Sequence, residues 1–234
     1  MLNNFFKKLK ILKRKFKYKK NSYSFGGVDL LIDYIFKHKN KGFYVDIGCQ
    51  HPISNNNTNL LYKKGWSGIN IDLDQTNIDL FNIERSNDIN ICSALSSKEG
   101  TEKLYLFHDG SPINSLSQSI SNLNKSKIKK VTNIKVNILN NFLKKYEINK
   151  IDFLNIDVEG HELNVLKGFD IDFFKPSIIC VEFLDTSMNK IEFTNIILDN
   201  ILNSEIYKFL INHKYHLVNM NHSDLIFVHN EFRD

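Results

Sequence analysis

Cysteine, proline and glycine are scarce in this 234-residue sequence, with three, three and ten copies respectively. The cysteines, Cys49, Cys92 and Cys180, are odd in number, widely spaced and in no CxxC motif. They therefore argue against a structural zinc cluster and a disulfide framework, and favour reduced thiols in a cytosol. No apolar run reaches 18 residues, so the sequence predicts no membrane-spanning helix. A hydrophobic share of 42% and a charged share of 24% exclude a wholly disordered or collagen-like chain.

Acidic residues are absent from the first 20 positions, which hold nine of the 31 lysines and arginines. Without them the body has 22 basic and 26 acidic residues, so it has no overall basic footprint and we expect no nucleic-acid partner. The length fits one domain. We therefore divide the chain into a basic amphipathic arm (1–24) and a single domain (25–234).

The arm repeats apolar residues at helical spacing but has no clean apolar core or small-residue cleavage site typical of a secretory signal. Two interpretations stay open. One is a peripheral contact of residues 1–20 with an anionic membrane, which places a cytoplasmic protein at the inner face of that membrane. The other is a helix that packs on the body or on a sister subunit of a homo-oligomer.

Short apolar runs alternate with helical segments along the body. The expected buried strands are 42–47, 68–73, 89–93, 151–156 and 177–183, with an edge strand or hairpin at 99–107 and a closing strand pair at 215–219 and 225–229. The expected helices are 28–38, 55–64, 75–84, 138–146, 161–167 and 191–213. This order predicts an α/β fold of Rossmann-like type, with a mostly parallel sheet, helices on both faces and an antiparallel C-terminal hairpin. Residues 108–130 read as a long loop with one short helix, of the kind that forms a lid.

In open α/β sheets, ligands bind at the carboxyl ends of the strands. The polar and small residues found there are Asp46, Gly48 and His51 after the first strand, Asp72 after the second, Ser93 and Ala94 after the third, Asp157, Glu159 and His161 after the fourth, and Glu182 in the fifth. A polar cluster of this kind is costly to bury without a ligand, a metal or mutual pairing. The pattern therefore predicts a functional site at this edge.

The turn after the first strand does not match the dinucleotide fingerprint, because Gly48 stands alone where GxGxxG needs three glycines. Asp72, 26 positions after Asp46, suits a ribose diol. Adenosine without a diphosphate fits better than a nicotinamide dinucleotide, which favours S-adenosylmethionine as the cofactor. The alternative for this pattern is a helix-capping Asp and a turn Gly.

Several segments, in the expected order, resemble the FkbM-type methyltransferases. They are YVDIGCQHPISNNNTNLLYKKGWSGINIDLD (44–74), CSALSSKEGTEKLYLF (92–107), IDFLNIDVEGHELNVLKGFD (151–170) and PSIICVEF (176–183). The resemblance implies a class I S-adenosylmethionine-dependent fold that O-methylates sugars, glycans or related products. It assigns Asp46 and Gly48 to the methionyl part of the cofactor, Asp72 to the ribose, Ser93 and Ala94 to the adenine, and Asp157 and Glu159 to the methyl and the acceptor.

An acceptor hydroxyl needs a general base or a metal ion to lose its proton. The candidate bases are His161, His51 and His108, with His161 favoured because it follows the acidic motif directly. Asp157, Glu159, His161 and Glu182 are candidate ligands of Mg²⁺ or Mn²⁺. The sequence does not separate a carboxylate site from a carboxylate–metal site.

The expected function is O-methylation of a sugar hydroxyl, in a nucleotide-activated sugar or a bacterial surface polysaccharide such as capsule or lipopolysaccharide. The alternative is a non-catalytic module that binds an adenosine ligand on the same fold. A nicotinamide-dependent reductase is disfavoured by the missing glycines.

Overall fold

The computed structural model describes residues 2–18, 20–123, 125–185 and 197–233. A seven-stranded sheet has the order β3-β2-β1-β7-β8-β10-β9, and a three-stranded sheet has the order β4-β6-β5. The strands are β1 Phe43–Ile47, β2 Ser67–Asp72, β3 Ile89–Cys92, β4 Ala94–Leu95, β5 Gly100–Leu106, β6 Lys130–Asn137, β7 Phe153–Ile156, β8 Ile178–Glu182, β9 Tyr215–Asn221 and β10 Asp224–His229. The predicted α/β fold with a mostly parallel sheet and an antiparallel C-terminal hairpin is confirmed, since only β10 runs antiparallel to its neighbours β8 and β9.

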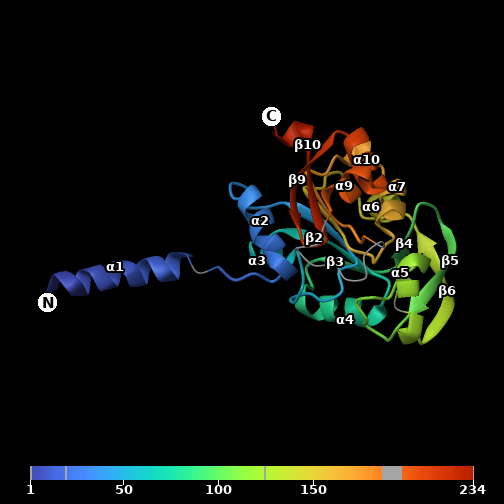
Figure 1. Ribbon diagram of the computed structural model, residues 1–234, viewed down its shortest axis with the longest axis horizontal. Helices are drawn as coiled ribbons and strands as arrows, with labels where there is room; N and C mark the ends of the chain where they lie inside the picture. Colours follow the sequence, from blue (N-terminus) through green and yellow to red (C-terminus); the bar gives the residue numbers. More distant parts are fainter. Residues whose placement is uncertain (1, 19, 124, 186–196, 234) are drawn as a thin grey trace.

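Helices pack on both faces of the large sheet, whereas α1 stands off the domain (Figure 1). The described residues form eleven α-helices in all. They are α1 Leu2–Tyr18, α2 Val28–Ile35, α3 Asn59–Lys63, α4 Gln75–Glu84, α5 Gln118–Leu123, α6 Leu139–Lys145, α7 Glu162–Lys167, α8 Ile171–Phe174, α9 Leu198–Asn203, α10 Glu205–Asn212 and α11 Asn230–Arg233, with 3-10 turns η1 Phe25–Gly27 and η2 Lys125–Lys127. The predicted helix 191–213 is two helices, α9 and α10, and its first six residues lie outside the described part of the chain.

The alternation of side chains along each strand separates two layers of core. Tyr44 and Phe153 point to the layer formed with α2 and α3, while their neighbours Val45 and Leu154 point to the layer formed with α6, α7 and α10. All four side chains are fully buried. Hydrophobic residues fill both faces of β1 and β7, as expected for central strands of a parallel sheet covered on both sides.

The second sheet was only partly anticipated. β5 falls within the predicted segment 99–107, and α5 is the short helix expected in the loop 108–130. The sequence predicts neither β4 nor β6, although β6, the central strand of this sheet, alternates more and less exposed residues as a strand with one covered face does. The loop that follows β5 of this sheet covers the carboxyl ends of β2, β3 and β7. The small sheet therefore helps to form the site.

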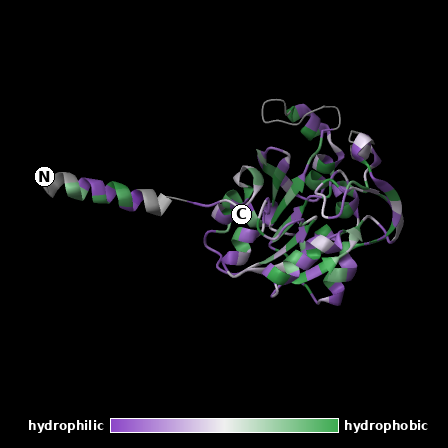
Figure 2. Ribbon diagram, turned by 90° about the horizontal axis from the view of Figure 1, so that it is seen from below, coloured by the Kyte–Doolittle hydropathy of each residue, from purple (hydrophilic) through white to green (hydrophobic). Residues whose placement is uncertain are grey.

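Among the described residues, no helix combines the length and the apolar character that crossing a bilayer requires. The first helix, α1, projects away from the domain (Figure 1), and along its length hydrophilic and hydrophobic residues alternate (Figure 2).

Candidate active site

A cleft opens at the carboxyl ends of β1, β2, β3 and β7. Its lining residues are Ile47, Gly48, Gln50, Ile71, Asp72, Leu73, Asn77, Ser93, Ala94, Leu95, Ser111, Pro112, Asn114, Leu116, Asp157, Val158, Glu159 and His161. Seven of the predicted site residues are therefore brought together, whereas Asp46, His51 and Glu182 lie outside this lining.

Asp72, the last residue of β2, links two turns of the cleft wall. Its Oδ2 accepts the backbone N–H of Gln50 at 2.9 Å, and its Oδ1 accepts that of Asp74 at 2.8 Å. Burial raises the pKa of this carboxyl, and the two backbone donors oppose that rise. The side chain of Asn77 also donates to this carboxylate and opposes the rise. The two oxygens have about four lone-pair sites in all, so one acceptor position remains for a ligand. The position suits a hydroxyl group.

Ser93 and Ala94 form the wall beside Asp72, where β3 leads into β4. The backbone N–H of Ser93 donates to the carbonyl of Asp72 at 2.8 Å. Asn137, at the end of β6, donates to the hydroxyl of Ser93 at 2.9 Å. The second sheet thus holds this wall in place.

Gly48 brings the turn after β1 against the turn after β7. It has φ +75°, and a Cβ built on it would lie 1.7 Å from the carbonyl oxygen of Asp157. A side chain here would therefore push the Asp157 backbone out of the site. The single glycine of this loop therefore allows the turn after β1 to lie directly against the turn after β7.

We expect Gly48→Ala to lower the free energy of unfolding by more than about 3 kcal/mol, because it combines left-handed strain with a backbone clash. Gly65→Ala is the matched control, since Gly65 has φ +91° and no atom within 4 Å of the added Cβ. That control measures strain alone, about 1 kcal/mol. Denaturant titration compares the two, and equal losses would contradict the close approach.

Asp46 lies behind the cleft wall rather than on it. Thr58 and Asn56 donate to its Oδ2 at 2.7 and 3.1 Å, and Asn155 donates to its Oδ1 at 2.9 Å. Its side chain is 1% exposed. The carboxylate of Asp46 is therefore not open to the methionyl part of the cofactor, the contact that the family resemblance implies for it. Instead, Asp46 ties the loop after β1 to β7.

Arg85, which sequence reasoning missed, is fully buried at the end of α4. Its guanidinium donates to the carbonyl of Pro52 at 3.1 Å, to Thr58 at 2.7 Å and to Asn56 at 2.7 Å. A planar group with five donors is well suited to collect oxygens from one loop. Arg85 therefore holds the loop that carries Gln50 to the cleft. An isolated arginine after a helix gives no sequence signal for this role.

The other two candidate histidines face their own loops. His51 Nδ1 accepts the backbone N–H groups of Ile53 and Ser54, both at 3.1 Å. His108 is exposed, with Nδ1 2.9 Å from the carbonyl of Asp109. Neither residue lines the cleft. A base role for either stays a prediction without support from its placement.

His161 lies in the cleft wall with both ring nitrogens engaged. Its Nε2 is 3.0 Å from Ser96 Oγ and 3.5 Å from Glu102 Oε2, and Asn164 Nδ2 is 3.2 Å from its Nδ1. Because an amide N–H donates to Nδ1, the ring proton belongs on Nε2. Burial lowers the pKa of His161, and Glu102 opposes the decrease. The ring thus connects the turn after β7 to the second sheet.

Three carboxyl groups converge where β7 and β8 end. One oxygen each of Asp157, Glu159 and Glu182 lies within 4.8 Å of the others. Glu159 has φ +55°, an uncommon conformation for a residue with a side chain. Glu182 is 9% exposed, and its buried Oε2 accepts no hydrogen bond from an N–H group or a hydroxyl of the described residues, while Ser223 lies 3.3 Å from Oε1.

The surroundings of this cluster are acidic. Burial raises the pKa of Asp157 to about 6, and burial together with the Asp157 charge raises that of Glu159 to about 8. Burial also raises the pKa of Glu162 and of Asp224 to about 7. Among the described residues, every charged group that shifts the pKa of Asp157, Glu159 or Asp224 is itself acidic. In the described part of the chain, no lysine or arginine therefore balances the negative charge of this cluster.

We expect Glu182→Gln to raise Tm at pH 8.5 by about 3 °C in the presence of a chelator, because a pKa shift of one unit corresponds to about 1.4 kcal/mol. Burial and the charges of Asp157, Glu159 and Glu162 raise the pKa of Glu182. The folded state keeps protons that the unfolded chain releases, so its stability falls as pH rises from about 5 to about 8.

At about pH 4 the gain from Glu182→Gln should largely disappear, because the carboxyl is then mostly protonated in the unfolded chain as well as in the folded state. The control is Glu84→Gln on the exposed face of α4. Thermal unfolding at both pH values measures the difference. A pH-independent loss of Tm in Glu182→Gln would contradict charge repulsion in the cluster.

The loop after β5 closes the cleft from the second sheet. Ser111, Pro112, Asn114 and Leu116 line it. Ser115 donates to the carbonyl of Glu159 at 2.7 Å, which fastens this loop to the acidic turn. The sequence predicts a lid in residues 108–130, and the residues of that segment that cover the cleft all precede α5.

Comparison with known proteins agrees with the site. Residues 46–217 match the family described as the methyltransferase FkbM domain, and this range includes every strand that lines the cleft except the first three residues of β1. No curated protein matches the chain. The family match covers well over half of the sequence, and we conclude that the chain belongs to the FkbM methyltransferase family.

Proposed function

We propose that this methyltransferase uses S-adenosylmethionine to O-methylate a sugar hydroxyl. The family membership implies this cofactor. The observation that carries the proposal is Asp72, whose carboxylate lies on a cleft wall without a dinucleotide loop and keeps one acceptor position beside its donors Gln50, Asp74 and Asn77. When bound, the cofactor supplies a methyl group activated by a sulfonium, ready for in-line displacement.

The residues present fit such a group. Asp72 would accept a ribose hydroxyl, Ser93 and Ala94 would flank the adenine, and Gly48 and Gln50 would border the methionyl part. A side chain at position 48 would displace the turn after β7, so the glycine preserves the cleft. These assignments need no movement of Asp46, which supports the loop from behind.

The acidic turn is the proposed proton acceptor. A hydroxyl must lose its proton as it attacks, and a base works best with a pKa near the working pH. Glu159, with a pKa raised to about 8 by burial and by Asp157, meets this condition and lines the cleft. We assign it the base role in place of His161, because both nitrogens of that ring have partners.

The acceptor would approach across α7 and the end of β8. A shallow groove there begins beside Glu159, at Gly160 and Glu162, and is bordered by Phe183, Ser204 and Glu205 among others. An aromatic face with hydroxyl and carboxylate groups is suited to sugars. Acidic walls repel a diphosphate, so we favour a neutral glycan of a bacterial surface polysaccharide over a nucleotide-activated sugar.

The test is formation of S-adenosylhomocysteine from S-adenosylmethionine with a panel of neutral glycans, amino sugars and nucleotide sugars. We expect turnover with neutral glycans and little with nucleotide sugars. Transfer to an amine or a thiol but to no sugar would contradict the proposal. Saturable binding of the cofactor with no turnover on any acceptor class would favour the non-catalytic binding module.

A further inference from the structure

The acidic cluster at the ends of β7 and β8 concentrates negative charge that no basic residue among its described neighbours balances. Asp157, Glu159 and Glu182 place one oxygen each within 4.8 Å, and their charged neighbours are acidic. Buried carboxylates without a counter-charge are costly. Either they hold protons or a cation occupies the space between them.

Glu182 supplies a second, independent observation. The residue is 9% exposed, and its Oε2 accepts no hydrogen bond from an N–H group or a hydroxyl among the described residues. Its carboxyl group lies within hydrogen-bonding reach of Asp157, so the two acids share either a proton or a cation.

We propose that Asp157, Glu159 and Glu182 bind one divalent cation, Mg²⁺ or Mn²⁺, next to the methyl-transfer position. Oxygens are the preferred ligands of both ions. Mg²⁺ holds oxygens at about 2.1 Å, so oxygens on opposite sides of the ion lie about 4.2 Å apart and adjacent ones about 3.0 Å apart. The three oxygens would therefore draw together as they bind the ion. The remaining ligands would be water and the acceptor.

The fourth ligand expected from the sequence, His161, does not belong to this set. Its Nε2 faces Ser96 and Glu102, on the side of the second sheet. The three carboxylates gather without it. His161 instead positions the turn that carries Asp157 and Glu159.

The inference rests on the proposed function and adds a role to it. A hydroxyl bound to the ion would have a lowered pKa and a fixed direction of attack. The ion would lower the pKa of Glu159 as well, so with the ion bound it is the acidity of the bound hydroxyl, and not a raised pKa of Glu159, that drives proton transfer to the second oxygen of Glu159. One O–H bond breaks, one C–O bond forms, and the carbon–sulfur bond of the cofactor breaks.

The test is titration of the chelator-treated protein with MnCl₂, followed by calorimetry and by the electron paramagnetic resonance of free Mn²⁺. We expect one Mn²⁺ per chain, competed by Mg²⁺, and affinity at least about tenfold weaker in Asp157→Asn and in Glu182→Gln. Asp79→Asn, an exposed carboxylate on α4, is the matched control.

A parallel titration with S-adenosylhomocysteine separates the two proposals. Cofactor binding without Mn²⁺ binding would overturn the cation site and leave the proposed function in place, with a protonated cluster or an acceptor ammonium group as the explanation. Mn²⁺ affinity that is equal in the variants and the control would also overturn it. Absence of cofactor binding would overturn the proposed function first.

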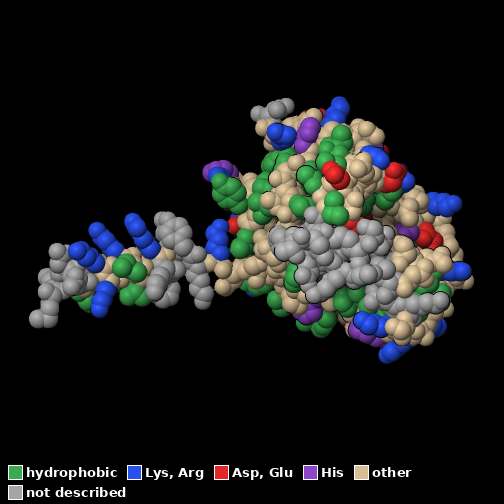
Figure 3. Space-filling view, viewed as in Figure 1, with side chains coloured by type: hydrophobic (Ala, Val, Ile, Leu, Met, Phe, Trp, Pro, Cys, Tyr) green, Lys and Arg blue, Asp and Glu red, His purple; other side chains and the backbone are tan. Residues whose placement is uncertain are grey.

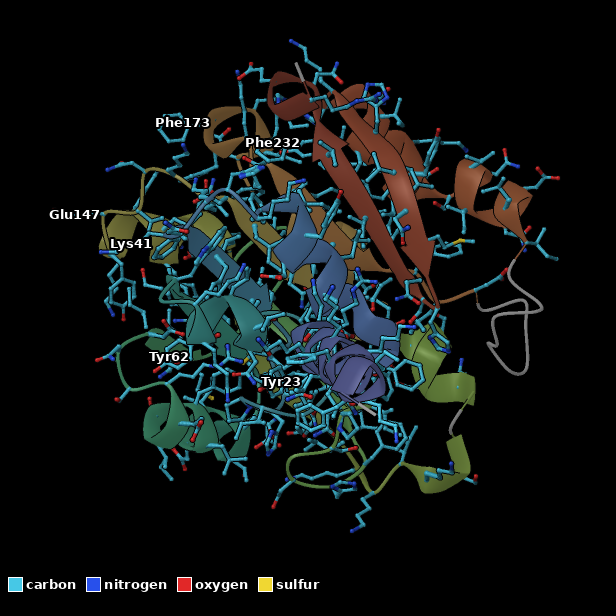
Figure 4. The ribbon with its side chains drawn as sticks, turned by 90° about the vertical axis from the view of Figure 1, so that its left-hand side faces the viewer. Tyr23, Lys41, Tyr62, Glu147, Phe173 and Phe232 are labelled. Carbon is cyan, nitrogen blue, oxygen red and sulfur yellow. The ribbon has the colours of Figure 1, made fainter. Side chains whose placement is uncertain are left out.

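A different observation concerns α1, which stands off the domain (Figure 1) and lies in front of it when the molecule is viewed along the arm, close to Tyr23 (Figure 4). Phe5, Phe6, Leu9 and Leu12 lie at helical spacing and are 37–60% exposed. Basic side chains are spread along the arm (Figure 3). Residues 1–20 hold nine lysines and arginines and no acid.

We infer that α1 lies on the surface of an anionic membrane, independently of the reaction. The apolar residues would enter the boundary of the acyl chains, while the basic residues would face the headgroups. Each basic residue near an anionic surface contributes about 1 kcal/mol. Charge complementarity supports this occupant, because residues 1–20 carry nine basic residues and no acidic one.

The test is co-sedimentation of the full chain with vesicles of phosphatidylcholine alone or with 30% phosphatidylglycerol, a fraction chosen at roughly the level that gives a marked surface potential. We expect binding only to the anionic vesicles, and loss of it in 0.5 M salt, about three times the physiological ionic strength. Leu9→Asp/Leu12→Asp should abolish it, whereas Ile83→Ser, an exposed apolar residue on α4, should not. Equal binding to neutral vesicles, or self-association through α1 without vesicle binding, would overturn the inference.

Discussion

Asp72→Ala is expected to weaken binding of S-adenosylmethionine and S-adenosylhomocysteine by about 10- to 100-fold, because a hydrogen bond to a charged group contributes about 1.5–3 kcal/mol. The Asp72 carboxylate lines the adenosyl side of the cleft and keeps one acceptor position beside its donors Gln50, Asp74 and Asn77. Calorimetric titration measures the affinity.

Asp72 also fastens the N–H groups of Gln50 and Asp74, so its removal affects the wall as well. Asp72→Asn keeps one acceptor oxygen and should lose an intermediate share of affinity. Asp79→Asn, on the exposed face of α4, serves as the control. Full affinity in the folded Asp72→Ala protein would remove Asp72 from cofactor recognition.

Glu159→Gln is expected to reduce turnover by about 10²–10⁴-fold, the usual contribution of a general base, while cofactor affinity stays within about threefold. The residue lines the cleft at the acceptor end, and its amide variant keeps the shape but takes up no proton. Formation of S-adenosylhomocysteine measures turnover, and calorimetry measures binding.

Glu147→Gln is a closely matched control, because Glu147 is exposed at the edge of the domain (Figure 4) and has the same φ of +55° as Glu159. It controls for the loss of one negative charge at a glutamate whose backbone lies in the left-handed region. If Glu159→Gln turned over at the rate of Glu147→Gln, Glu159 would not be the base, and Asp157 would be the next residue to test.

The sheet could be predicted because its strands carry a strong physical signal. β1, β2, β7 and β8 are short apolar runs that end at a glycine or an acid, as strands buried on both faces do. β6, the central strand of the small sheet, lacks that signal because only one of its faces is partly buried, so lysine and asparagine stand between its apolar residues. The helix expected at 55–64 begins only at Asn59, since Asn56 and Thr58 turn instead toward Arg85 and Asp46.

The site followed in part from the rule that strand ends meet at one edge. That rule gathers Asp72, Asp157 and Glu159, which belong to strands adjacent to β1. It does not say which side chains continue into the cleft and which turn away, and Asp46 and His161 turn to partners that are distant in sequence. Arg85 and the second sheet act through such tertiary contacts, which no local pattern encodes.

The central claim is that the cleft at the ends of β1, β2, β3 and β7 binds an adenosyl cofactor. Isothermal titration of the full chain with S-adenosylmethionine and S-adenosylhomocysteine, with NADH as the control ligand, tests it most directly. We expect saturable binding of both adenosyl ligands at one site per chain, and none of NADH. Folded protein that binds neither adenosyl ligand, or that binds NADH instead, would contradict it.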